Sequence, residues 1–474
     1  MWCQIQIAGR ALKRQVEQLQ RFRDFKWKVL PRTTLKLSRI LINDFSMPHF
    51  HYTLLPPHRF CWTAEGGYYF IRGNWSVEFK PPKWLSFFSP RLRKRRVWKG
   101  QFWAESRGYP KLLVSGRFTR TKENTAQISH VSCDCKVGQV ALSILGDSLV
   151  SNVLHLFRRY LLNNVRPAVE KGVCNTARKF INESINKKVS QFSYYNLLGC
   201  MMMDFGLVRD VILNRNFIES WHKGESKHRD HLLEPTPFQP DPIQQPDMIN
   251  SSKMLHILVS EYFFNSLFYH AHTFNLTAVK YNEDNEAAVL WSPNPTCLME
   301  CLGSHFPELA SADENAKSEI RISTTSPPTV RFRAGEAAVK AEGKLQVYRV
   351  EAAKNGSDSD LIFEAYGSIE TSVTVKVESR DEENPRVVPT YSAWKVTVDS
   401  ARSDLIHDIN PESMTENTQM LLDFARKTVE QLVNENAAKG VALPFAYYSR
   451  FNNTDMTIEN QTLVISTDFE FFGF

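Results

Sequence analysis

The densest run of chemically active side chains is a basic segment at residues 91–99. Arg91-Leu-Arg-Lys-Arg-Arg-Val-Trp-Lys99 carries six positive charges in nine residues. Cations this close repel one another and cannot be buried unless an anion lies near them. Arginine suits phosphate because its planar guanidinium donates hydrogen bonds in pairs. The segment therefore predicts an anion-binding loop whose cations are Arg91, Arg93, Lys94, Arg95, Arg96 and Lys99. A solvated loop or a proteolytic processing site is the alternative.

Aromatic side chains accompany this basic segment. Trp98 lies within it, and Trp84, Phe87 and Phe88 precede it. Rings of this kind favour the interface between water and a bilayer. We expect the loop to combine attraction to an anionic surface with shallow insertion of these rings.

Combinations that would support catalysis or metal binding are weak. His228-Arg-Asp-His231 and His49-Phe-His51 pair imidazoles, but no third and fourth ligand follows at a helpful spacing. The sequence has no G-x-S-x-G, H-E-x-x-H, P-loop or G-x-G-x-x-G motif. We therefore expect neither an enzyme nor a metal site.

Cysteines and glycosylation sequons bear on the compartment. The eight cysteines are too few for a disulfide-rich scaffold. Seven sequons favour the secretory pathway, at Asn74, Asn182, Asn250, Asn275, Asn355, Asn452 and Asn460. The first residues lack the basic start and apolar core of a signal peptide. We expect an extracellular glycoprotein whose signal peptide is not visible in this sequence.

Charge is unevenly distributed along the chain, whose formal net charge is +7. Residues 1–250 hold 39 Lys and Arg against 19 Asp and Glu, a net charge of +20; residues 251–474 hold 19 against 32, a net charge of −13. A basic half without a nucleic-acid motif is compatible with nucleic acid, an acidic glycan or an anionic lipid surface as partner. No run of about 18 apolar residues could span a membrane.

The element that must support the basic half is a long helix at Ser148–Ile185. Apolar residues recur in it with the 3.6-residue period. Pro167 predicts a kink, because the apolar stripe continues on the same face after it. A helix of this length spans roughly 55 Å at ~1.5 Å per residue, so an equally long surface must cover its stripe: Val150, Val153, Phe157, Leu161, Val165, Ala168, Val169, Val173, Ala177, Phe180, Ile181 and Ile185.

The remaining pattern repeats one order of elements. Residues 11–22 predict a short amphipathic helix and residues 35–131 predict antiparallel strands, ahead of the long helix. Five prolines in residues 235–246 predict an extended, stiff linker. Beyond it we expect a helix at residues 252–270, then strands, then a helix that opens with the Ser413-Met-Thr-Glu416 capping box. The strands include residues 329–333, 345–350, 372–377 and 394–398.

Five segments carry a resemblance to a known family. They are residues 140–174, Asp204-Phe-Gly-Leu207, Ser260-Glu-Tyr-Phe-Phe-Asn265, Ser326-Pro-Pro-Thr329 and Lys439-Gly-Val-Ala-Leu-Pro444. In this order and spacing the chain resembles, from Ile5 to its C-terminus, the family of bactericidal/permeability-increasing protein, lipopolysaccharide-binding protein and the plasma lipid-transfer proteins. The resemblance implies an α+β fold. It would be an elongated boomerang of two barrels, each a twisted antiparallel sheet wrapped on a long helix, joined by a central sheet.

The resemblance also implies where lipid would bind. Each barrel in such proteins holds a phospholipid in an apolar groove between helix and sheet, with no other cofactor, and the basic segment matches the tip of the first barrel. The alternative is that the apolar side chains simply fill the core. The predicted groove residues are Leu12, Val16, Leu19, Val153, Phe157, Leu161, Val165, Phe264, Leu267, Phe268, Leu421, Phe424 and Leu432.

The family's shared disulfide, which ties the long helix to a strand, matches Cys135 and Cys174 by resemblance. Cys133 is two residues away and is the other possible partner of Cys174. Cys297 and Cys301 either pair or remain free.

These inferences lead to a predicted organisation and function. We expect a basic N-terminal lipid-binding barrel at residues 1–195, central-sheet strands and linker at 196–252, an acidic C-terminal lipid-binding barrel at 253–445, and a strand returning to the central sheet at 446–474. The expected function is a secreted, monomeric protein that captures anionic lipid at membrane surfaces, bacterial lipopolysaccharide above all, with an antibacterial role in innate immunity. The alternative is a phospholipid transfer protein that shuttles lipid between membranes or lipoprotein particles.

Overall fold

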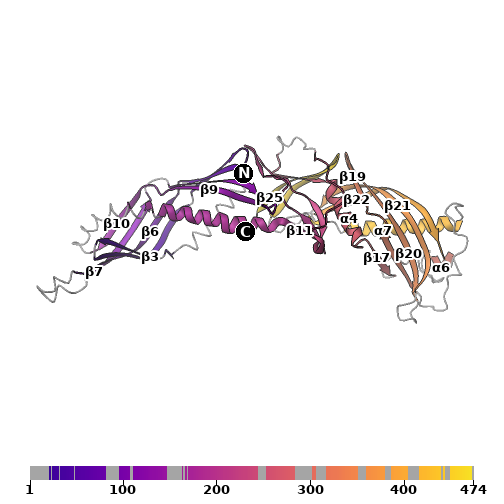
Figure 1. The fold of residues 1–474 in the computed structure, drawn as a ribbon, viewed down its shortest axis with the longest axis horizontal. Coiled ribbons are helices and arrows are strands. Elements are labelled where there is room, and N and C mark those ends of the chain that lie inside the picture. Colours follow the sequence, from indigo (N-terminus) through magenta and orange to yellow (C-terminus); the bar gives the residue numbers. More distant parts are fainter. Residues whose placement is uncertain are drawn as a thin grey trace. The chain divides into compact units, whose positions relative to one another are not determined.

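The structure is a computed structural model of the chain, which forms two compact units (Figure 1). Unit 1 comprises Met1–Ser193 and Gly206–His222, and unit 2 comprises Tyr194–Phe205 and Lys223–Phe472. These ranges leave out the last two residues of the chain. The structure describes residues 21–22, 24–30, 32–46, 48–81, 96–106, 110–146, 163, 166–167, 169–243, 252–282, 302–305, 317–350, 359–378, 386–403, 416–438, 441–442 and 449–471. Both units combine helices with antiparallel sheets, which is the predicted α+β class. The four predicted segments and the boundaries between them remain predictions.

Unit 1 contains two main sheets. The larger joins β1 (Arg21–Phe22), β3 (Thr33–Ser46), β6 (Tyr68–Phe79), β7 (Arg96–Ser106) and β10 (Val140–Gly146) in that order, with β2 (Phe25–Leu30) paired to β3. The smaller has the order β4 (His49–Leu55), β5 (Arg59–Glu65), β8 (Lys111–Arg120), β9 (Ala126–Lys136). A short hairpin of β13 (Ile212–Leu213) and β14 (Ile218–Glu219) belongs to the same unit.

Aromatic packing sets the core of the six-stranded sheet. Trp75 is buried, and its ring nitrogen donates a hydrogen bond to the Leu145 carbonyl at 3.2 Å. Gly100 on the next strand makes this possible, because a Cβ there would stand 2.2 Å from that carbonyl oxygen and 2.6 Å from the Trp75 ring. The absence of a side chain at residue 100 therefore lets an indole lie flat across the sheet.

A helix packs beside the four-stranded sheet of unit 1. Residues 169–180 are α-helical and continue into the π-helical turn η3 (Ile181–Ile185) and α3 (Asn186–Ser190). The Asn186 side chain accepts a hydrogen bond from Ile128 N at 2.8 Å and donates one to Ile128 O at 2.9 Å. Glu170 accepts one from Val137 N at 3.0 Å, so the helix runs antiparallel to β9.

The buried face of this helix differs from the predicted stripe. Cys174 and Ile181 are buried, but Val169, Val173 and Phe180 are 42%, 37% and 38% exposed. The reason is that the side-chain anchors to β9, at residues 170 and 186, fix the rotation of the helix. A polar contact thus overrides apolar periodicity at these positions. The prediction was wrong for these three residues, and all six stripe residues before Val169 lie outside the described residues.

Unit 2 is built on a seven-stranded sheet. Its order is β17 (Val279–Asn282), β18 (Lys317–Thr324), β20 (Glu336–Val350), β21 (Ser359–Glu378), β22 (Arg386–Arg402) and β23 (Val441–Ala442), with β19 (Thr329–Arg333) paired to β20. Two three-stranded sheets complete the unit. One orders β16 (Leu255–Ser260), β25 (Thr462–Phe471) and β24 (Ser449–Glu459), and the other orders β11 (Tyr194–Leu198), β12 (Met201–Asp204) and β15 (Glu225–His228).

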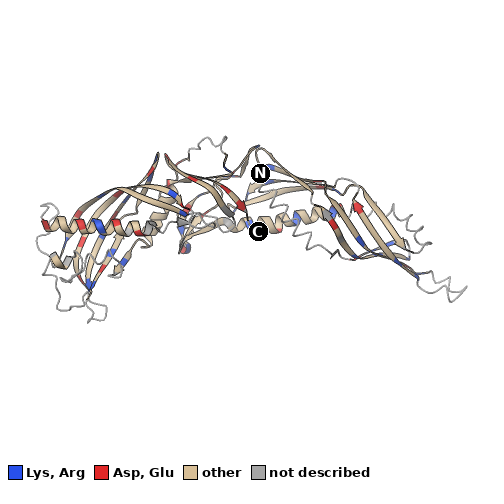
Figure 2. Ribbon diagram, turned by 180° about the vertical axis from the view of Figure 1, so that it is seen from behind, with Lys and Arg blue, Asp and Glu red and all other residues tan. Residues whose placement is uncertain are grey.

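Helix α7 (Glu416–Ala438) supplies the core of unit 2. Leu421, Phe424 and Ala425 are buried in one cluster with Phe363 and other apolar residues of the seven-stranded sheet. The rest of the helix carries both acidic and basic residues (Figure 2), and Arg426 pairs with Glu430 one turn later. The amphipathic pattern predicted for this helix is confirmed where its side chains are described.

The predicted helix at residues 252–270 is partly wrong. Residues 255–260 form strand β16, and α4 (Glu261–Thr273) begins only after Ser260. Ile257 and Val259 are β-branched, which favours a strand, and β16 pairs with β25 along its whole length. Short apolar runs do not distinguish a strand from a helix by periodicity alone.

The helix α4 covers the outer edge of β19. The Asn265 side chain donates to Val330 O at 3.1 Å and accepts from Val330 N at 2.7 Å, and the Glu261 carboxylate accepts from Phe332 N. Side chains thus provide the hydrogen bonds that a further strand would make. Two residues of the Ser260–Asn265 motif have this structural role.

The proline-rich linker packs against unit 2 over its described part. Residues 232–243 contain no helix or strand after the short turn that ends at His231, as its prolines predict. Thr236 is buried and its hydroxyl lies 2.9 Å from the Tyr262 hydroxyl. Phe238 meets Tyr262 and Tyr269 edge-on. The first part of the linker therefore packs against α4.

Candidate lipid-binding surface

An apolar sheet face is the principal candidate surface of unit 1. Four buried residues of the six-stranded sheet, Leu35, Ile40, Trp75 and Phe102, form its centre. Six further apolar residues surround them and are only partly buried: Leu37, Ile71, Val77, Trp98, Leu142 and Ile144. Alternation along the strands, together with the register shift in β3 between Ser38 and Leu41, places them on one side of the sheet. This face can accept hydrocarbon without leaving polar groups unpaired.

The strand β7 connects this face to the predicted anion site. Arg96 and Lys99 lie in β7 and are exposed, whereas Trp98 packs against the apolar cluster. The ring of Trp98 therefore belongs to the sheet, and its expected insertion into a bilayer is not supported. Arg91, Arg93, Lys94 and Arg95 lie outside the described residues, as do Trp84, Phe87 and Phe88.

The predicted groove residues fall into three groups. Leu12, Val16, Leu19, Val153, Phe157, Leu161 and Val165 lie outside the described residues, and the side chain of Leu432 is likewise not described. Phe264 and Phe268 of α4 pack in a cluster with Phe332 and Val373. Leu421 and Phe424 of α7 lie in a separate cluster. The structure does not bring these two groups together, and their contact with lipid stays a prediction.

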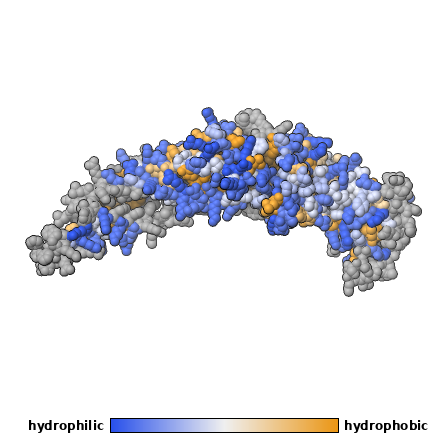
Figure 3. All heavy atoms as spheres, in the orientation of Figure 1, coloured by the Kyte–Doolittle hydropathy of each residue, from blue (hydrophilic) through white to orange (hydrophobic). Residues whose placement is uncertain are grey.

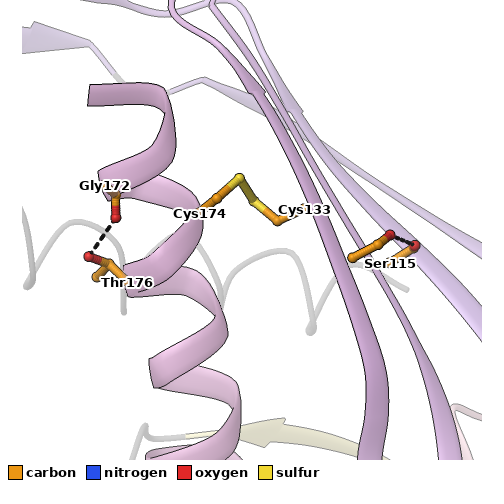
Figure 4. Close-up of a disulfide and its surroundings, with 6 residues drawn as sticks. Ser115, Cys133, Gly172, Cys174 and Thr176 are labelled. Atoms are coloured by element: carbon orange, nitrogen blue, oxygen red, sulfur yellow. Dashed lines mark hydrogen bonds between the residues drawn. A yellow bond between two sulfur atoms is a disulfide. The ribbon is translucent and has the colours of Figure 1, made fainter. Parts of the chain in front are cut away.

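A disulfide joins the helix of unit 1 to β9 (Figure 4). It links Cys133 with Cys174, whose Cα atoms are 5.5 Å apart, and Cys135 is free. The expected pairing of Cys135 with Cys174 is therefore wrong. Cys133 and Cys135 share the face of β9 that meets the helix. Because Glu170 bonds Val137 N beyond Cys135, the helical turn that follows it carries Cys174 to Cys133.

The unpaired Cys135 is chemically subdued. Burial raises the pKa of its thiol to about 11, and the nearby carboxylates of Glu170 and Asp134 act in the same direction. A thiol with this pKa is almost entirely protonated at neutral pH. The free cysteine beside the disulfide is therefore a poor nucleophile.

The predicted glycosylation asparagines are mostly accessible where they are described. Asn182, Asn275, Asn452 and Asn460 are exposed. Asn74 is half-buried within β6, between Ser38 of β3 and Gln101 of β7, which makes it the least suitable acceptor among them. Asn250 and Asn355 lie outside the described residues, as do Cys297 and Cys301.

A buried charge network in unit 2 escaped the sequence reasoning. Glu225 and Lys227 of β15 form an ion pair of 3.3 Å, with side chains only 11% and 8% exposed. Burial acts to raise the pKa of Glu225, but hydrogen bonds from Thr236 and the charge of Lys227 outweigh it and leave the pKa lowered. Nearby, Lys223 pairs with the buried Asp204 at 2.9 Å. Charged residues two apart in a strand normally indicate a solvated face, so this burial could not be predicted from the sequence pattern.

The paired histidines have structural positions. His228 and His231 pack against Phe274 with ring centroids 4.4 and 4.5 Å away.

None of the described helices is both long and apolar enough to cross a bilayer. Figure 3 shows a largely hydrophilic surface on one side, with apolar residues in small groups.

Both units combine antiparallel sheets with amphipathic helices, and similarity to known proteins identifies the family that shares this fold. The C-terminal domain of the LBP/BPI/CETP family matches residues 198–471, more than half of the chain. The chain therefore belongs to the LBP/BPI/CETP family, as its sequence motifs predicted. Members of this family are generally lipid-binding proteins without enzymatic activity.

Two relatives extend the match to unit 1. Bactericidal permeability-increasing protein of Sebastes schlegelii is 22% identical over 355 residues, which cover 73% of this chain and 69% of that protein. The crystal structure of lipopolysaccharide binding protein matches with a TM-score of 0.54 at 14% identity, over 98% of this chain and 95% of that chain. The latter similarity shows the fold.

Proposed function

We propose that this protein is a secreted lipid-binding protein that captures anionic lipid, in particular bacterial lipopolysaccharide, and acts in antibacterial defence. Family membership and the name of the Sebastes schlegelii relative support the class of ligand. The disulfide and the exposed sequons support secretion, because such bonds persist in oxidising compartments.

The observation that carries the proposal is the combination of charge and apolar surface in unit 1. Unit 1 holds 36 Lys and Arg against 13 Asp and Glu, a net charge of +23, and unit 2 holds 22 against 38, a net charge of −16. The structural division separates charge more sharply than the division at residue 250. The partly buried apolar sheet face lies in the cationic unit.

Capture would proceed in two stages. Coulomb attraction draws the cationic unit to phosphate groups, and it acts over a screening length of about 8 Å at physiological ionic strength. Acyl chains then contact the apolar face, with a gain of roughly 25 cal/mol per Å² of apolar area buried. The first stage weakens as salt rises, and the second resists salt.

A binding assay tests this order of events. Lipopolysaccharide would be added at low and at physiological salt to the protein and to a variant with glutamine at Arg91, Arg93, Lys94, Arg95, Arg96 and Lys99. We expect capture by the variant to be at least about tenfold slower at low salt, since steering by charge changes association rates by 10 to 1,000. The matched control replaces six cations of unit 2, namely Lys280, Lys317, Arg331, Arg333, Lys376 and Lys427, and should capture lipid as before.

Equal loss of capture in both variants would show that no particular segment selects the lipid, and unchanged capture by the first variant would contradict the proposal.

Mass spectrometry of lipids extracted from the protein in its native source would identify any bound phospholipid. A donor-to-acceptor vesicle assay separates capture from the alternative role, because a transfer protein moves phospholipid continuously between particles.

A further inference from the structure

The outward face of the four-stranded sheet in unit 1 carries cations remote in sequence from the basic segment. The face opposite Cys133 and Cys135 contains Arg59 of β5 and Arg117 of β8, both exposed. Glu65 on the same face is already paired with Lys111. The disulfide and the helix lie on the other side, so this face is separate from the helix-covered surface.

Arg59 and Arg117 are directly opposite each other in the antiparallel pairing of β5 with β8. Opposed residues in such a pair have Cα atoms about 4.5 to 5.5 Å apart, and like charges in this arrangement destabilise a sheet. Neither arginine forms an ion pair with an acidic residue of the described chain. An anion bound between the two guanidinium groups would remove this repulsion.

A pocket lies over these arginines. It has a volume of about 250 Å³ and is lined by Arg59, Ser115, Gly116, Arg117, His130 and Ser132. None of the described residues that line it is acidic. A single water needs about 10 to 15 Å³ of such space, so the pocket has room for a phosphate group.

A bulge in β9 shapes the pocket. The pairing of β8 with β9 shifts between Ser115 and Arg117, and His130 adopts a left-handed φ of 51°. Such strain is kept where it re-aims a side chain. The hydroxyl oxygens of Ser115 and Ser132 lie 2.7 Å apart and are hydrogen-bonded (Figure 4). Both hydroxyl groups therefore lie at the pocket wall. Hydroxyl, imidazole and guanidinium groups all donate to oxyanions.

We propose that this pocket binds a phosphate group, with Arg59 and Arg117 as its paired ligands and His130 and Ser132 as additional donors. The site goes beyond the proposed lipid capture, because it lies on another sheet and uses no residue of the basic segment. Planar guanidinium groups on adjacent strands suit the tetrahedral oxyanion, whose charge removes the repulsion between them.

Calorimetric titration with inorganic phosphate at constant ionic strength tests the site. We expect Arg59→Gln/Arg117→Gln to bind phosphate at least about tenfold more weakly, which is what the loss of a charge-assisted hydrogen bond produces. Lys136→Gln is the matched control, since it removes a cation from β9 of the same sheet outside the pocket. It should bind as the parent does, and so should the glutamine variant of the basic segment.

A second measurement guards against a variant that merely fails to fold. In phosphate-free buffer of low salt, Arg117→Gln should unfold at the same or a higher urea concentration than the parent, because a like-charge repulsion has been removed. Phosphate should raise the midpoint of the parent but not that of Arg117→Gln. Parental phosphate affinity in the double variant, equal loss in Lys136→Gln, or a lower midpoint for Arg117→Gln would each overturn the site.

The source of the phosphate is resolved by two further arms. Phosphatidylcholine vesicles with and without phosphatidic acid would be compared with inorganic phosphate as competitor. Arginine-dependent binding of the phosphatidic acid vesicles would assign the site to a lipid head group, and binding of inorganic phosphate alone would assign it to a soluble phosphate. Failure of both arms would overturn this site while leaving capture by the basic segment to its own assay.

Discussion

Replacing Cys133 should destabilise unit 1 far more than replacing Cys135. The disulfide to Cys174 closes a loop with a sequence separation of 41 residues. Closure of such a loop removes about 13 cal/mol/K of entropy from the unfolded chain, or about 4 kcal/mol at 25 °C. We expect Cys133→Ala to lower the free energy of unfolding by about this amount. Cys135→Ala should cost about 1 kcal/mol or less, since only a half-buried sulfur atom is lost.

The comparison needs a third variant, because Cys135 shares the helix-facing side of β9 and is a potential substitute partner for Cys174. Cys133→Ala/Cys135→Ala removes that route and should show the full loss. Urea unfolding without reductant measures the effect, with a midpoint lowered by about 1.3 to 4 M at m-values of about 1 to 3 kcal/mol/M. Peptide mapping identifies the bond. Equal destabilisation by Cys133→Ala and Cys135→Ala, or a Cys135–Cys174 peptide from the parent, would refute the reasoning.

Three further predictions follow from packing and ionisation. Gly100→Ala should lower the free energy of unfolding, measured in urea, by about 1 to 3 kcal/mol because the new methyl group overlaps buried atoms. Gly172→Ala is the control. A Cβ at this helical position meets nothing within 4 Å, so the substitution should be neutral or stabilising. The folded pKa of Glu225 is lowered, so its stabilising contribution is present above its unfolded pKa and is lost as pH falls through the folded value. Glu225→Gln should remove that part of the acid sensitivity of unit 2 in thermal scans, and an unchanged pH profile would contradict it. Burial, and secondarily the nearby carboxylates, raise the pKa of Cys135 to about 11. The rate of alkylation of Cys135 should therefore increase about tenfold per pH unit from pH 7 to 10. A rate that levels off near pH 8.5, as for an unfolded thiol, would show that the thiol is not buried.

Strands were the most predictable elements of the fold. Residues 329–333 were predicted as a strand and form β19 with the same bounds, because Val330 and Phe332 alternate with charged residues and only the apolar pair is buried. The strand at residues 255–260 was mistaken for helix because its apolar residues are nearly continuous. What decided it was pairing with β25, some 200 residues later, which local periodicity cannot reveal.

The candidate site was predictable in type but not in detail. The cationic character of the N-terminal half follows from composition alone, whereas the choice between Cys133 and Cys135 depends on the helix register that Glu170 and Asn186 set. Arg59 and Arg117 lie 58 residues apart and resemble ordinary exposed cations in the sequence. Only the β5–β8 register makes them neighbours.

The contacts of α4 with β19 have a consequence for solution behaviour. Open strand borders recruit other polypeptides and promote fibrous assembly. The side-chain amide of Asn265 and the carboxylate of Glu261 hydrogen-bond the backbone along the edge of β19. The backbone groups that they occupy cannot pair with a strand of another polypeptide. The covered strand edge limits edge-to-edge assembly, so Asn265 protects against aggregation in addition to packing α4 on β19.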